Sequence, residues 1–107
     1  MRGAFVAMVA VALPGAVMAV PTKSPASERA YTLSLMCSAV AANDGEQADY
    51  SRTFDAVRKT GRKLGHSEAR ISQDVLTMAQ VVGDRAHRDP SSLDGNREIC
   101  RKLGLVG

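Results

Sequence analysis

Residues 46–64 read EQADYSRTFDAVRKTGRKL, and apolar or small residues recur in this stretch at alternating intervals of four and three. The recurring positions are Tyr50, Phe54, Val57, Gly61 and Leu64. Because an α-helix has about 3.6 residues per turn, this spacing places all of these positions on one face. The stretch therefore predicts an amphipathic helix. Gly61 lowers its helix propensity, but within the apolar stripe it would let a neighbouring helix approach closely.

The sequence on either side of this helix divides into three further helical segments. Turn-forming residues separate the segments, and no stretch alternates β-branched and polar residues as a half-buried strand does. Ser67 and Ser92 stand where they would cap the last two helices. The four predicted helices span residues 25–42, 46–64, 68–87 and 93–103. Because 107 residues allow a single domain, we expect an all-α fold, a small four-helix bundle.

The first predicted helix, residues 25–42, is apolar on two sides. Cys37 and Val40 lie on one face, whereas Tyr31 and Leu35 lie on another. A helix with two apolar faces is either central in a bundle or part of an interface.

The third predicted helix, residues 68–87, also has a broad apolar face. Leu76 lies beside its main stripe and widens it. Such a face suits self-association, for example as a homodimer, or docking of a partner helix; the alternative is burial inside the bundle. The candidate interface residues are Tyr31, Leu35 and Leu76.

Residues 1–19 have the three-part pattern of a secretory signal peptide. A positive charge at Arg2 precedes an apolar run over residues 3–13, and compact residues end the segment at Ala19. We expect cleavage after Ala19. The alternative is an uncleaved membrane anchor, but a Pro-Gly pair interrupts the apolar stretch, which is barely long enough to span a bilayer.

Cleavage would leave a single helical domain, residues 20–107, with no transmembrane segment. These 88 residues contain 13 Lys and Arg against 11 Asp and Glu, a net charge of +2. Because this charge is small, we do not expect a nucleic-acid partner. The expected location is the periplasm or the extracellular medium.

The chain has two cysteines, Cys37 and Cys100. Export would place them in an oxidising compartment, where disulfides persist. One intramolecular bond would join the first helix to the last and close a loop of about 64 residues, which the chain-entropy model values at roughly 4 kcal/mol. The alternatives are an intermolecular bond and two free thiols. A metal site is not expected, since neither cysteine has a Cys or His at ligand spacing.

The second predicted helix carries the densest group of charges in the sequence. Its candidate anion-binding residues are Arg52, Arg58, Lys59, Arg62 and Lys63. They could contact lipopolysaccharide, lipid headgroups or an acidic protein. No aromatic residue interleaves with them, which argues against single-stranded nucleic acid. The alternative is a solvated face whose cations suit the helix C-terminus.

The sequence contains no recognisable catalytic or cofactor-binding motif. It lacks the serine-hydrolase elbow, the His-Glu-x-x-His zinc pair and the phosphate-binding loop. Gly45 and Gly95 do not lie in calcium-loop contexts, and His66 and His87 lack the spacing of metal ligands. We therefore expect a protein that is not an enzyme and binds no metal or cofactor.

Three functional hypotheses follow. The first is a small exported non-enzymatic protein that acts through protein–protein contacts. The second is an acid- or stress-responsive periplasmic chaperone, because the size, helical class and long-loop disulfide are similar in outline to acid-stress periplasmic chaperones; this similarity implies no site residues. The third is a binder of anionic envelope polymers through the basic face of the second helix.

Overall fold

The computed structural model describes residues 25–107, and its regular elements in this range are all helices. They are α3 (Pro25–Asp44), α4 (Gln47–Lys63), α5 (Glu68–Arg88), the 3-10 helix η3 (Pro90–Leu93) and α6 (Asp94–Lys102). The predicted all-α fold with four helices is confirmed. The predicted signal peptide lies outside the described residues. Within them, no helix is long and apolar enough to cross a membrane.

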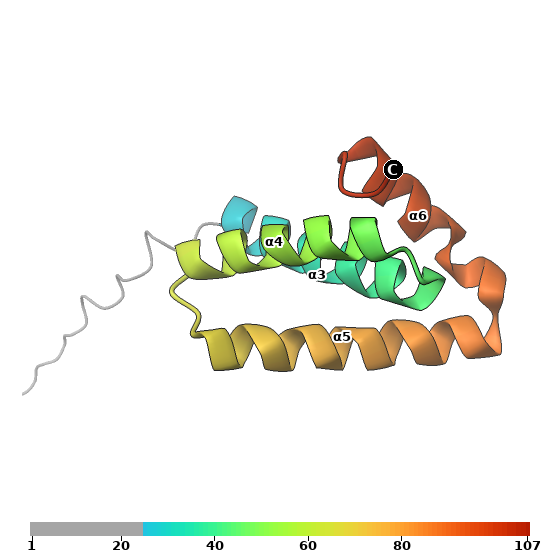
Figure 1. The fold of residues 1–107 in the computed structure, drawn as a ribbon, viewed down its shortest axis with the longest axis horizontal. Coiled ribbons are helices and arrows are strands. Elements are labelled where there is room, and N and C mark those ends of the chain that lie inside the picture. The colour runs from blue at the N-terminus through green and yellow to red at the C-terminus, as the bar shows by residue number, and fades with distance from the viewer. Residues whose placement is uncertain (1–24) are drawn as a thin grey trace, which may run out of the picture.

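Helix α3 is the central element of the fold (Figure 1). It packs along both α4 and α5, whereas α4 and α5 make few contacts with each other. This arrangement explains why the sequence of α3 is apolar on two sides. It also leaves most of the outer face of α4 open to solvent.

Two adjoining clusters form the core. The first consists of Tyr31, Leu35, Val57, Leu64, Ile71 and Val75. The second consists of Ala39, Val40, Val82 and Leu93. Met78 is half-buried and packs against both clusters, so the core is continuous along α3.

Gly61 lies at a tight contact between helices in the core. A Cβ atom at this position would lie 2.9 Å from the Tyr31 ring and 2.9 Å from the Ile71 side chain. Real Cβ atoms do not make contacts this short. The prediction that Gly61 allows close packing is confirmed.

Helix α6 begins within one residue of its predicted start, but its cap differs from the prediction. Pro90 begins η3, and Ser92 therefore lies inside this short turn instead of capping the following helix. Its buried hydroxyl has no hydrogen-bond partner among the described residues. By contrast, Ser67 caps α5 as predicted, since its Oγ accepts a hydrogen bond from the Arg70 amide at 3.1 Å.

The last helix is fastened to α3 at two points. Cys37 and Cys100 form the predicted intramolecular disulfide, with a Cα–Cα distance of 5.7 Å and both side chains fully buried. Arg97 donates hydrogen bonds from Nε and Nη2 to the carboxylate of Asp44, both at 2.9 Å. The disulfide thus joins the first described helix to the last.

Candidate anion-binding face

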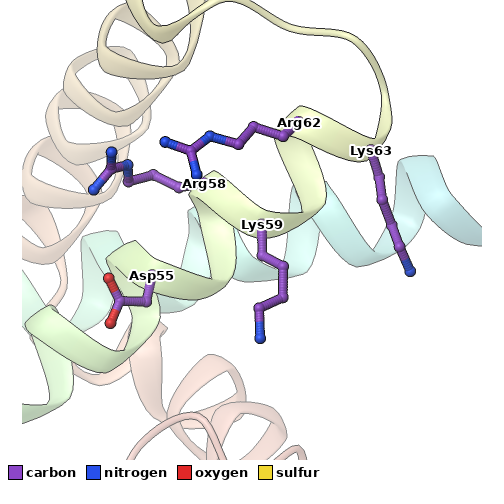
Figure 2. Close-up of a pocket in the computed structure, with 5 residues that line it drawn as sticks. All are labelled: Asp55, Arg58, Lys59, Arg62 and Lys63. Atoms are coloured by element: carbon purple, nitrogen blue, oxygen red, sulfur yellow. The ribbon is translucent and has the colours of Figure 1, made fainter.

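The structure divides the five predicted cations into two groups. Arg58, Lys59, Arg62 and Lys63 lie in the last two turns of α4, where together with Asp55 they line an open surface hollow of about 570 Å³ (Figure 2). We call this hollow, with the four cations that line it, the basic hollow.

Arg52 lies nearer the start of α4 and has other partners. Its Nη1 contacts Asp49 Oδ1 at 2.8 Å and the Leu105 carbonyl oxygen at 3.5 Å. Arg52 therefore helps to hold the chain after α6 against α4, and it does not line the basic hollow.

The two arginines of the basic hollow converge on one carboxylate. Arg62 donates to Glu68 Oε2 from Nη2 at 2.7 Å and from Nε at 3.1 Å. The hydrogen bond from Arg62 is the main reason why the pKa of Glu68 lies below its usual value. Arg58 Nε is 3.4 Å from Glu68 Oε1 and forms an ion pair, but the buried Nε–H makes no hydrogen bond. Glu68 thus accepts hydrogen bonds from Arg62 but leaves the Arg58 Nε–H without one.

The two lysines are the free cations of the basic hollow. Among the described residues, neither Lys59 nor Lys63 makes an ion pair or a side-chain hydrogen bond, and both are exposed. Figure 2 shows their ammonium groups on one side of α4 and the guanidinium groups of Arg58 and Arg62 on the other. The lysines are therefore available to a ligand without any rearrangement.

Local structure explains why the cations gather here. The end of α4 carries the negative pole of the helix dipole, which favours cations. Gly65 then adopts φ +82°, a left-handed conformation that suits glycine, and ends the helix. The short turn that follows returns the chain to Glu68 at the start of α5. The Arg58 guanidinium lies 5.9 Å from the centre of the Phe54 ring, which supports its position. Phe54 lies between Arg52 and Arg58 in the sequence, so the expectation that no aromatic residue interleaves with the cations is wrong.

Sequence reasoning missed Glu68. Its signal was present, because Glu68 is the first residue of a predicted helix and follows Arg62 after a turn of a few residues. The pairing nevertheless depends on the path of that turn, which periodicity does not specify.

The three candidate interface residues have different environments. Tyr31 and Leu35 are buried in the core of the single chain. The Tyr31 hydroxyl donates to Asp74 at 2.7 Å, and burial followed by this contact raises its pKa. Leu76 is 61% exposed on α5. Of the three, only Leu76 presents its side chain to a partner.

A second, smaller hollow is apolar. It has a volume of about 290 Å³ and is lined mainly by the start of α3 and the chain after α6, including Leu33, Leu103 and Leu105. The sequence did not indicate this hollow. Leu103 and Ile99 are large apolar residues at and near the end of α6, and they are 48% and 44% exposed. Both remain outside because the short α6 buries little beyond Cys100.

The described residues contain no group of three or more His, Cys, Asp and Glu that could hold a metal ion. Comparison of the chain with protein-family models, curated proteins and solved structures found no match. The basic hollow gathers four cations within two turns of one helix.

Proposed function

We propose that this protein is a small exported, non-enzymatic helical protein that binds an anionic polymer of the cell envelope through the basic hollow. The observation that carries the proposal is the placement of four cations on two exposed turns of α4, with Lys59 and Lys63 lacking an acidic partner among the described residues. The buried disulfide supports the exported location, because such bonds persist in oxidising compartments.

The geometry favours a polymer over a small ligand. The hollow is open, and the lysines and arginines lie on different sides of α4. A single small anion would not reach all four cations, whereas a chain of repeated anionic groups can contact them in succession. Each contact is weak and screened by salt, so the affinity comes from their number.

The proposal predicts salt-sensitive binding that depends on the free lysines. The wild type should bind dextran sulfate, a model anionic polymer, and lose affinity as salt rises from about 0.05 to about 0.5 M, since screening shortens the range of the charges. Lys59→Gln/Lys63→Gln should weaken binding by about thirtyfold, because each of the two cations near an anionic surface contributes about 1 kcal/mol and about 1.4 kcal/mol corresponds to tenfold. Fluorescence titration of labelled polymer would measure both effects.

The matched control is Arg85→Gln/Lys102→Gln. Both residues are exposed on other helices, so this variant loses the same net charge away from the basic hollow. Its affinity should stay close to that of the wild type. Equal weakening by the two double variants would show that net charge alone acts, and no binding by the wild type at low salt would refute the proposal.

Protein–protein contact through α5 is the second candidate function. Leu76 and Val81 are 61% and 51% exposed, as expected for a helix that can meet a second copy or another protein. They lie five positions apart, however, and so point in different directions around the helix. For this reason we rank the contact below the basic hollow. A strictly monomeric mass by light scattering at high concentration would contradict the homodimer version.

A further inference from the structure

We infer that Glu68 is a built-in competitor of the basic hollow that makes it select polymers bearing phosphate monoesters over polymers bearing carboxylates. This inference rests on the proposed function and concerns the same site. It starts from the fact that the two arginines of the hollow already pair with an anion, the carboxylate of Glu68.

The pairing with Glu68 is open to exchange. Glu68 and Arg62 are both more than half exposed, with side-chain exposures of 55% and 58%. Exposed ion pairs contribute little to stability because water competes for both partners. An anion that binds more strongly than Glu68 can therefore replace it without unfolding the turn between α4 and α5.

A ligand carboxylate gains little from this exchange. It has the same charge and the same two oxygens as Glu68, and Glu68 is tethered beside the arginines at a high effective concentration. A carboxylated polymer would therefore bind mainly through Lys59 and Lys63. The arginines would stay paired with Glu68.

A phosphate monoester brings more negative charge and more acceptor oxygens to the two arginines than a carboxylate does. At neutral pH it carries a charge of about −1.5 to −2 and three acceptor oxygens. Glu68 leaves the buried Arg58 Nε–H without a hydrogen bond while it satisfies Arg62. A phosphate group with a third oxygen can accept from both guanidinium groups, and such charge-assisted bonds are strong. The wild type should therefore prefer phosphate at this position.

The test compares two polymers on one backbone. Dextran phosphate and carboxymethyl dextran, matched in anionic groups per sugar, would be titrated against the wild type and Glu68→Gln. The wild type should bind dextran phosphate about tenfold more tightly than carboxymethyl dextran. Glu68→Gln should tighten binding of carboxymethyl dextran by about fivefold and that of dextran phosphate much less, because only the carboxylate ligand is held off by Glu68.

Two further variants separate competition from net charge. Asp84→Asn removes a carboxylate of α5 that pairs with Arg88, about 24 Å along the helix from Glu68. It changes the net charge equally and should leave the preference between the polymers unchanged. Glu68→Asp keeps the charge but shortens the reach to Arg58 and Arg62, and should shift the preference in the direction of Glu68→Gln.

The outcomes are distinct. Binding of neither polymer by the wild type would refute the proposed function itself. Binding of both with no preference, or an equal effect of Glu68→Gln and Asp84→Asn, would refute the role of Glu68 and leave the basic hollow intact as a site. Loss of the preference in Glu68→Gln alone, with a partial loss in Glu68→Asp, would support the inference.

Discussion

At the scale of single residues, Gly61 is the most crowded of the described glycines. It faces the Tyr31 ring and the Ile71 side chain, and the hydroxyl of Tyr31 is held by Asp74. A methyl group at position 61 must therefore displace a ring that is anchored at its far end. Overpacking of this kind costs about 1–3 kcal/mol, whereas glycine replacement inside a helix gains about 0.5–1 kcal/mol.

We expect Gly61→Ala to destabilise the protein by about 1 kcal/mol, because the overpacking outweighs the gain in helix propensity. Urea unfolding followed by circular dichroism would measure the change in free energy. Gly83→Ala is the matched control: Gly83 lies inside α5 with open space around it, so the same substitution should stabilise the protein. A stabilising Gly61→Ala would mean that the α3–α4 contact yields more easily than its distances indicate.

At the scale of helices, the sequence predicted all four helices, but it did not predict the cap of the last one. The ends of α3, α4 and α5 lie within two residues of the predicted ends, because long apolar stripes and the Ser67 cap mark them clearly. Helix α6 also begins and ends within one residue of its predicted bounds. Ser92 does not cap α6 because Pro90 begins a 3-10 turn that includes Ser92. This turn depends on the burial of Leu93 in the core, which the local sequence does not specify.

Helix α6 owes its position to α3. It has nine residues, fewer than an isolated helix needs for stability in water. The Cys37–Cys100 disulfide and the Asp44–Arg97 pair hold it in place. The sequence predicted the disulfide from export and cysteine number, but the Asp44–Arg97 pair, like Arg62–Glu68, joins residues brought together only by the fold.

At the scale of the whole molecule, the central place of α3 explains where the candidate site lies. Because α4 packs mainly on α3 and hardly on α5, its last turns expose cations that a closed bundle would partly cover. Ion pairs also link the helices at the two ends of the bundle. Arg62–Glu68 links α4 to α5, and Arg97–Asp44 links α6 to α3.

These ion pairs make the molecule sensitive to acid. Hydrogen bonds from Arg97 and Arg62, respectively, are the main causes that lower the pKa values of Asp44 and Glu68 in the folded chain. A carboxyl group whose folded pKa is lowered stabilises the fold above its unfolded pKa, which is near 4 for Asp and Glu. This stabilisation is lost as the pH falls through the folded pKa. Acid also removes negative charge while Lys and Arg stay charged, which adds repulsion within the chain.

We therefore expect the free energy of unfolding to fall steadily below about pH 4.5. The variant Asp44→Asn should show how much of this change comes from the Asp44–Arg97 ion pair between α3 and α6. At pH 7 this variant should be less stable than the wild type by about 1 kcal/mol, the upper end for an ion pair that is not fully buried. The difference should shrink toward zero as the pH falls through the folded pKa of Asp44, because Asp44 then becomes protonated in both states of the wild type. Thermal unfolding at a series of pH values would measure it. A difference that stays constant with pH would show that Asp44 acts through its shape and not its charge.

If acid also exposes apolar surface to a fluorescent dye and the protein then suppresses aggregation of a client at pH 3, the hypothesis of an acid-responsive chaperone gains support; a compact, inactive protein at that pH would refute it.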